Sequence, residues 1–381
     1  MLMCFGWSRI VKEVATVLRY CCMNTNPTEL MAHRTPLEQP KQKNRITRIL
    51  HLLKIAFSHG PIYAIALYRM TSSASFDPQQ NWNMWTKKRN RFLETILRAY
   101  PAHSRRIKLL KKMMQQGHAD GIEFHYDVSN EFYRLMLDKD YMFYTCARFL
   151  SDTETLEQAQ IHKADFILDM LDPKPGQQIR DLGFGWGGMM RRLSERTGTR
   201  EGLVGYTLSK QQLAYVKNLG FSVELQDFIE KDYGKELLDR VVSVGSFEHV
   251  RAEEIEDLYI KIFQALKPGG RMVNQFFSLN IEPYPYSMVL VQLFFPGSCL
   301  VMHDVHVQAA KKAGFVIEAD VTDSYKRTLR AWYDNLVANR DEIISKCGID
   351  IYNEYLTCLP VGWRFFDDGE GTLHRMLLVK P

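Results

Sequence analysis

Hydrophobic residues follow two different spacings along this chain. In its second half, short apolar runs alternate with helical patterns. Seven runs have the length and composition of strands: Gln178–Leu182, Leu203–Thr207, Ser222–Leu225, Arg240–Gly245, Arg271–Phe277, Phe315–Val321 and Leu373–Val379. Strands that alternate with helices form parallel sheets whose two faces are both covered. The pattern therefore predicts an α/β fold with a mainly parallel, seven-stranded sheet.

In the N-terminal third the apolar spacing is helical instead. The apolar face of the first expected helix consists of Ile46, Ile49, Leu50, Leu53 and Phe57. After a break at Thr71–Trp82, two more basic helices are expected over Trp85–Tyr100 and Ser104–Gln116. We therefore expect a basic helical region over residues 1–115 and an α/β domain over residues 116–381.

The chain ahead of these helices gives weaker signals. Asn24–Lys43 is polar and contains three prolines, which is typical of a linker. Before it, apolar residues between Ile10 and Cys21 fall on one helical face. Two interpretations stay open for that segment: an amphipathic helix at a membrane interface, or a helix packed on the main body.

Charge is distributed unevenly. The whole chain carries a net charge of +5, but sixteen Lys or Arg and only two acids lie between Lys41 and Lys112. Such an imbalance indicates an anionic partner. Because the apolar helix face of Ile46–Phe57 lies within this basic region, an anionic membrane surface is favoured over nucleic acid as the partner. We therefore expect a cytoplasmic protein that binds the membrane peripherally. A helical bundle whose cations face water is the alternative, and a homodimer is a further expectation.

Composition fits a globular protein that works in a reducing compartment. The 381 residues are 46% hydrophobic and 12% aromatic, enough for a large core. The seven cysteines contain no C-x-x-C pair, so free thiols are expected. The longest uncharged run, Pro283–Met302, is interrupted by prolines and does not predict a membrane span. No spacing suggests a metal site, and His303 and His306 are interpreted as surface residues.

The strongest candidate for chemistry is the glycine-rich stretch Asp181–Gly188. It follows an expected strand and precedes an expected helix, which is the arrangement of a nucleotide-type binding corner. Gly183 and Gly185 allow the backbone to approach a ligand closely because no Cβ intervenes. The stretch lacks the Lys-Ser/Thr pair that binds phosphates, so S-adenosylmethionine fits better than a nucleotide. A plain tight turn is the alternative.

Several motifs occur in an order that resembles one family. They are His125–Asn130, Tyr144–Cys146, Ala159–Gln160 with Lys163, Asp181–Gly188, Thr207–Ser209 with Gln212, Phe247–Val250 and Leu266–Gly270. Together they resemble the cyclopropane-fatty-acyl-phospholipid synthase and mycolic acid methyltransferase family over Asp120–Pro381. The resemblance implies a class I, Rossmann-like S-adenosylmethionine methyltransferase fold, with an acyl-chain cap near residues 283–302.

The resemblance also implies which residues hold the cofactor. Gly183 and Gly185 would line the methionine and ribose parts, and Asp227 would contact the adenine. The complete implied set is Tyr144, Thr145, Asp181, Gly183, Gly185, Thr207, Gln212 and Asp227.

The implied reaction is methylation of a double bond in an unsaturated acyl chain of a phospholipid. The family uses a bicarbonate ion to take up a proton from the cation that forms. The implied catalytic residues are Cys146, Glu248, Gln275 and Tyr325. Gln275 departs from the family's usual histidine, and glutamine cannot carry positive charge. The product therefore stays open between a cyclopropane and a methyl or methylene branch.

Two other functions compete with this one. Amine and alkaloid N-methyltransferases share these motifs, and a membrane-bound protein that has lost catalysis would also explain the change at Gln275. The basic N-terminal region and the apolar run at residues 283–302 favour a lipid substrate. Retention of Cys146, Glu248 and Tyr325 favours an active enzyme.

Overall fold

The computed structural model describes residues 45–88, 99, 101–126, 129–281 and 285–381. The segment between Ile10 and Cys21 and the expected linker Asn24–Lys43 lie outside these residues. So does most of the expected helix over Trp85–Tyr100.

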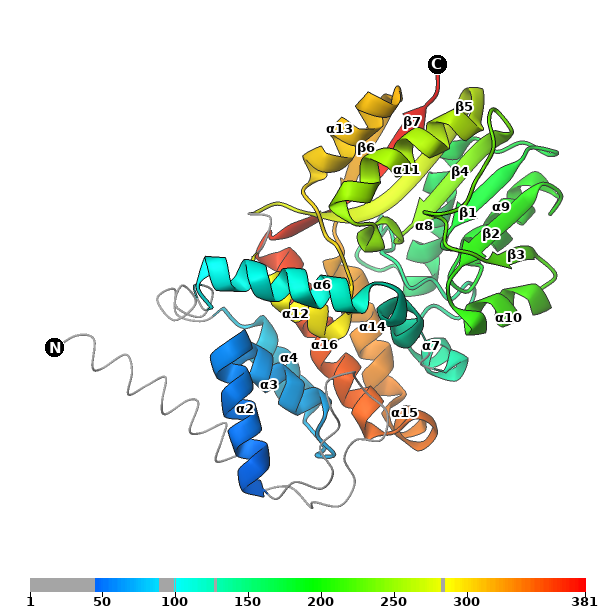
Figure 1. Cartoon of the computed structure of the whole chain (residues 1–381). Helices are drawn as coiled ribbons and strands as arrows, with labels where there is room; N and C mark the ends of the chain where they lie inside the picture. The colour runs from blue at the N-terminus through cyan, green and yellow to red at the C-terminus, as the bar shows by residue number, and fades with distance from the viewer. Residues whose placement is uncertain (1–44, 89–98, 100, 127–128, 282–284) are drawn as a thin grey trace.

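All seven predicted strands are present and form one sheet (Figure 1). They are β1 (Ile179–Leu182), β2 (Leu203–Thr207), β3 (Ser222–Leu225), β4 (Leu238–Val244), β5 (Leu266–Leu279), β6 (Val316–Asp323) and β7 (Gly371–Val379). Their order across the sheet is β3-β2-β1-β4-β5-β7-β6. Strand β7 alone runs in the opposite direction to the other six strands. The predicted, mainly parallel α/β sheet is confirmed.

Helices cover both faces of this sheet (Figure 1). Helices α11 (Ala252–Ala265) and α13 (His303–Ala313) share one core with the strands, while α8 (Leu156–Leu171) and α9 (Gly188–Thr197) share another. Val241 belongs to the first core and Val242 to the second, because successive strand residues point to opposite faces. Helix α10 (Lys210–Asn218) lies beside β2 and β3.

Five further helices pack together around a core of their own, separate from the two cores that flank the sheet. They are α4 (Pro78–Thr86), α7 (Asn130–Met136), α14 (Lys326–Ala338), α15 (Arg340–Cys347) and α16 (Ile349–Asp367). These helices share an aromatic core that includes Trp82, Tyr133 and Trp332. The predicted break at Thr71–Trp82 is wrong in its second half: the Asp77 side chain accepts from the Gln80 N–H at 2.6 Å and caps α4, which begins at Pro78.

The N-terminal helices pack directly on the C-terminal part of the chain. They are α2 (Arg45–His59), α3 (Pro61–Met70) and α6 (His103–Tyr126); α6 contacts α12 (Tyr286–Phe294), and α3 contacts both α12 and α16. The Tyr286 hydroxyl accepts the Tyr63 N–H at 3.2 Å, just past the turn that joins α2 to α3. Helix α6 runs without interruption through the expected boundary at residues 115 and 116. Within the described ranges, no helix has the length and apolar character needed to cross a bilayer.

Candidate active site

The glycine-rich stretch forms the turn between β1 and α9. Gly183, Gly185 and Gly187 have φ values of 85°, 56° and 78°, which L side chains rarely adopt. A Cβ on Gly185 would meet no protein atom within 4 Å, so this glycine borders open space. The turn lies at the carboxyl end of β1, between β2 and β4, where the strand order reverses. Ligands of open α/β sheets bind at such a switch point.

A pocket of about 100 Å³ opens beside this turn. Seven of the eight implied cofactor residues line it, namely Tyr144, Thr145, Asp181, Gly183, Gly185, Thr207 and Gln212. Asp227 is not among the lining residues, whereas its neighbour Phe228 is. The Asp227 carboxylate instead accepts the Ile229 backbone N–H at 2.8 Å, which turns it back onto its own loop. The structure therefore does not bring Asp227 to the pocket with the others.

Asp181 gives this pocket a buried acceptor. The residue is 1% exposed, and its Oδ2 atom has no hydrogen-bond partner among the described residues. Burial raises the pKa of Asp181 to about 7, and the nearby Lys163 ammonium opposes that rise. A buried oxygen without a partner costs free energy until a donor arrives. A ligand with an ammonium or hydroxyl group, such as S-adenosylmethionine, fits this wall of the pocket.

The wall after β2 offers a donor. The Thr207 hydroxyl donates to the Gln212 side-chain oxygen at 2.8 Å. Because that oxygen is engaged, the NH₂ end of the Gln212 amide is the part that can donate to a ligand. The Ser209 hydroxyl accepts the Gln212 backbone N–H and caps α10.

Two residues of α8 hold the third wall in place. The Lys163 ammonium donates to the Thr145 hydroxyl at 2.8 Å and lies 3.4 Å from the centre of the Phe143 ring. The Gln160 amide donates to the Thr145 carbonyl oxygen at 3.0 Å. The sequence indicates Gln160 and Lys163 only as parts of a motif, because their partners lie in a separate loop.

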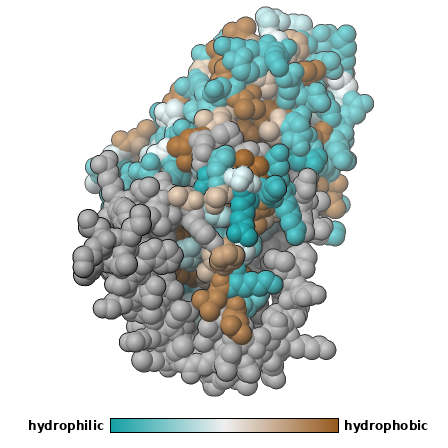
Figure 2. All heavy atoms as spheres, turned by 60° about the vertical axis from the view of Figure 1, so that its left-hand side comes forward, coloured by the Kyte–Doolittle hydropathy of each residue, from teal (hydrophilic) through white to brown (hydrophobic). Residues whose placement is uncertain are grey.

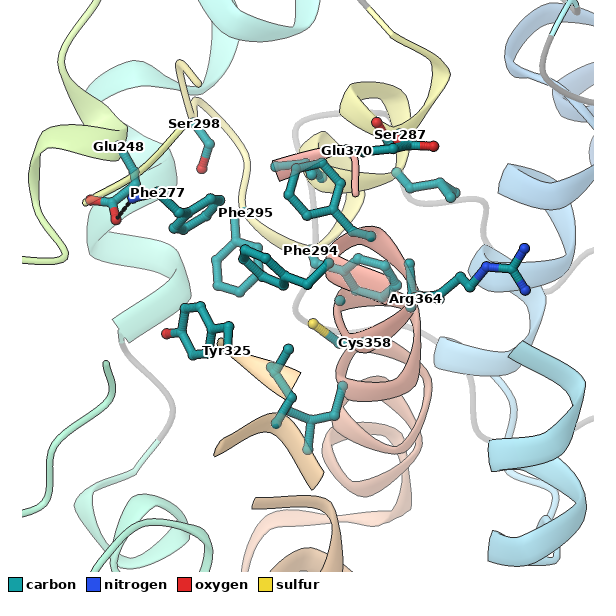
Figure 3. A pocket seen from close by; sticks show the side chains of 18 of the residues that line it. Glu248, Phe277, Ser287, Phe294, Phe295, Ser298, Tyr325, Cys358, Arg364 and Glu370 are labelled. Carbon is teal, nitrogen blue, oxygen red and sulfur yellow. Dashed lines mark hydrogen bonds between the residues drawn. The ribbon is translucent and has the colours of Figure 1, made fainter. Parts of the chain in front are cut away.

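A second, larger cavity adjoins the first. It has a volume of about 280 Å³ and shares Tyr144, Thr145, Gly245 and His249 with the cofactor pocket. Its walls are mostly apolar; side chains of α12 and α16 line it in Figure 3, and α3, α4 and α6 each add one more residue. The four implied catalytic residues, Cys146, Glu248, Gln275 and Tyr325, all line it. The sequence did not predict that Ile62 of α3, Trp85 of α4 and Arg106 of α6 would line it too.

Glu248 presents a partly satisfied carboxyl group to this cavity. Its Oε1 atom accepts the Phe277 backbone N–H at 3.1 Å (Figure 3), while Oε2 is buried with no partner among the described residues. Burial raises the pKa of Glu248 to about 7, against the hydrogen bonds from backbone N–H groups. The group therefore exchanges a proton near neutral pH, as an acid or base must.

The backbone carbonyl of Cys146, and not its thiol, contacts another catalytic candidate, Gln275. Burial raises the pKa of the Cys146 thiol to about 12, so it stays neutral. The sulfur faces the Thr328 hydroxyl at 3.9 Å and the Ser324 carbonyl oxygen at 3.8 Å. The carbonyl oxygen of Cys146 accepts from the Gln275 amide at 3.4 Å.

Aromatic rings surround the remaining catalytic candidate, Tyr325. Its ring centre lies 5.1 Å from that of Phe366, 5.9 Å from that of Trp332 and 6.2 Å from that of Phe277. All four residues line the larger cavity. Their ring faces can stabilise a positive charge that forms between them.

The histidines expected at the surface behave differently from each other. His306 is 2% exposed and its ring centre lies 3.9 Å from that of Phe276, so the surface assignment is wrong for it. The half-buried His303 stacks on His374, and both imidazoles bond to the Asp320 carboxylate. The spacing in the sequence hides these contacts because Asp320 and His374 lie on different strands.

Comparison with known proteins identifies the family. Residues 113–376 match the family described as mycolic acid cyclopropane synthetase. The chain is 33% identical to hydroxymycolate synthase MmaA4 of Mycobacterium tuberculosis, over 69% of this chain and 93% of that protein. It resembles the crystal structure of mycolic acid cyclopropane synthase CmaA1 complexed with SAH and CTAB, with a TM-score of 0.63 and 29% identity over 69% of this chain and 98% of that one.

A third likeness extends into the N-terminal helices. Coclaurine N-methyltransferase, solved with N-methylheliamine and SAH, covers 87% of this chain and 99% of its own, with a TM-score of 0.60. At 18% identity this likeness concerns the fold alone. The family match and the more similar relatives support a narrower conclusion. The chain belongs to the mycolic acid cyclopropane synthetase family and is an S-adenosylmethionine-dependent methyltransferase of the class I fold.

Proposed function

We propose that the protein methylates the double bond of an unsaturated acyl chain of a phospholipid. The observation that carries this proposal is the apolar cavity of about 280 Å³, which meets the cofactor pocket at Tyr144 and Thr145. S-adenosylmethionine supplies an electrophilic methyl group when it is bound. An alkene carbon has the electron pair to take that methyl group, and an apolar cavity suits the chain that carries it.

The residues around the junction fit the charges of this reaction. Methylation of an alkene leaves a carbocation, which the rings around Tyr325 can stabilise. A proton must then leave, either from the new methyl group with ring closure or from a neighbouring carbon to give a branch. Glu248, whose pKa is raised to about 7 by burial, can share that proton. The Glu248 Oε2 atom has no partner among the described residues, and in the protonated carboxyl it can donate to a small oxyanion such as bicarbonate, which the Gln275 amide also fits.

Lipid mass spectrometry of cells that express the protein tests the proposal. We expect acyl chains to gain the mass of one CH₂ when the protein is present and not when an empty vector is used. A methylated amine without any change in acyl chains would favour a small-molecule N-methyltransferase. No new product of either kind would favour the third alternative, a protein without catalysis.

We also propose that α2 docks on an anionic membrane surface. Leu50, Leu53 and Phe57 of α2 are 60%, 44% and 66% exposed. Figure 2 shows hydrophobic (brown) spheres next to hydrophilic (teal) ones in the lower half of this view of the molecule. The Arg105 guanidinium lies 5.3 Å from the centre of the Phe57 ring. Exposed apolar groups beside cations match the interface of an anionic bilayer. On the buried side of α2, Ile55 packs against the cluster that includes the cavity residue Tyr286.

The double variant Leu53→Ser/Phe57→Ser should sediment with anionic phospholipid vesicles about tenfold less well than the wild type, because two insertable side chains are lost. Leu150→Ser is the matched control: Leu150 is also 62% exposed but lies before α8. Binding of the wild type should weaken as salt is added. Equal binding to neutral vesicles at every salt concentration, or unchanged binding of the double variant, would contradict this docking mode.

A further inference from the structure

A buried guanidinium stands directly behind the catalytic candidates. Arg375 lies on β7 opposite Gln275 on β5, and its side chain has an exposed fraction of 0%. Side chains of directly opposed residues project from the same face of a sheet. The Arg375 Nε atom accordingly lies 2.7 Å from the Gln275 side-chain oxygen.

The contact with Arg375 fixes the orientation of the Gln275 side-chain amide. A guanidinium carries only N–H donors, so the atom of Gln275 that meets Arg375 has to be the oxygen. The NH₂ end then points away from Arg375, where one N–H donates to the Cys146 carbonyl oxygen at 3.4 Å. Gln275 also lines the larger cavity, which leaves its second N–H as the group it can offer there.

The charge around Arg375 is not fully cancelled. Arg375 bonds to the Asp323 carboxylate at 2.9 Å, but that carboxylate also lies 3.6 Å from the Arg148 guanidinium. One negative charge is therefore shared by two guanidinium groups. A second Arg375 nitrogen lies 3.5 Å from the Cys146 carbonyl oxygen, which brings the positive charge close to the cavity wall.

We propose that Arg375 is a positioning residue, which turns the Gln275 amide so that an N–H donor faces a small anion in the cavity and adds positive charge behind it. The proposal rests on the proposed function, because it names how this chain holds the anion of that reaction. It also explains the departure noted at residue 275. A protonated histidine at that place would meet the Arg375 cation, whereas a glutamine oxygen accepts from it.

The test is a titration of the SAH-bound protein with ¹³C-labelled bicarbonate, followed by NMR. Arg375→Met should weaken bicarbonate binding at least about tenfold, since it removes a charged hydrogen bond and its field. Arg375→Lys should lose less, because it keeps the charge but cannot hold the amide in a fixed fork. Arg148→Met is the matched control: it removes the other guanidinium near Asp323 but keeps the contact between Arg375 and Gln275, so it should weaken binding less than Arg375→Met does.

A second readout separates orientation from folding. With ¹⁵N-labelled glutamine, the side-chain NH₂ signals of Gln275 should shift on addition of bicarbonate in the wild type and in Arg148→Met, but not in Arg375→Met. Bicarbonate binding by Arg375→Met equal to that of the wild type would overturn the inference. If Arg375→Met does not fold, equal binding by Arg375→Lys with an unshifted Gln275 signal would overturn it as well. A wild type that modifies acyl chains but binds no bicarbonate would overturn this inference alone and leave the proposed function standing.

Discussion

Gly185→Val should abolish binding of S-adenosylhomocysteine, with a loss of affinity of at least about a hundredfold in calorimetry. The glycine has a φ of 56°, and its missing Cβ would project into the open space of the cofactor pocket. A valine there would fill the room that the ligand needs. Its branched side chain would also strain the left-handed backbone.

The strain can be separated from the occlusion by a matched variant. Gly198 ends α9 with a φ of 71°, and a Cβ there would likewise meet no atom within 4 Å. Gly198→Val should therefore lose similar folding stability in thermal denaturation while keeping its affinity for S-adenosylhomocysteine. If Gly185→Val bound the ligand as well as Gly198→Val does, the cofactor would have to bind elsewhere.

Glu248→Gln should lower turnover by about two to four orders of magnitude and leave the affinity for the cofactor nearly intact. Glutamine keeps the shape and can still accept the Phe277 N–H, but it has no acidic proton to share with the neighbouring anion. Glu248 lines the larger cavity and not the cofactor pocket, so binding of the cofactor should not change. Proton NMR of extracted acyl chains measures the product directly.

The pH dependence of turnover shows which protonation state of Glu248 is the active one. Because the pKa of Glu248 is raised to about 7, the carboxyl holds its proton below that pH and loses it above. An ionised Glu248 would repel a neighbouring anion, so turnover of the wild type should fall as the pH rises past about 7. The residual activity of Glu248→Gln should lack that step. Glu370→Gln, at the opposite side of the cavity in Figure 3, is the control carboxyl and should keep both the rate and the step.

The sequence predicted those parts of the fold that depend on neighbouring residues. Most strands contain a short apolar run, and Gly183 and Gly185 mark their turn by themselves, so both can be located from local pattern. The Gln275 and Arg375 pair could not, because it depends on the register between β5 and β7. The family resemblance indicated Gln275 as an exception, but only its partner on the next strand explains it.

Other differences have the same origin. The family resemblance implies that Asp227 contacts the adenine, whereas its carboxylate accepts an N–H of its own loop and Asp227 does not line the cofactor pocket. Helix α4 was missed because a short polar stretch gives little periodicity, although Asp77 and Pro78 are a recognisable start signal. The contribution of Trp85 to the cavity depends on how α4 packs on α16, which no local pattern encodes.

Helices α3, α4 and α6 each contribute one residue to the wall of the larger cavity, namely Ile62, Trp85 and Arg106. All three precede residue 113 and so lie outside the region that matches the family. Part of the wall of the larger cavity is thus encoded outside the stretch that carries the cofactor turn and the catalytic candidates. Under the proposed function, substitutions at these three positions change the room for the acyl chain without altering the cofactor turn.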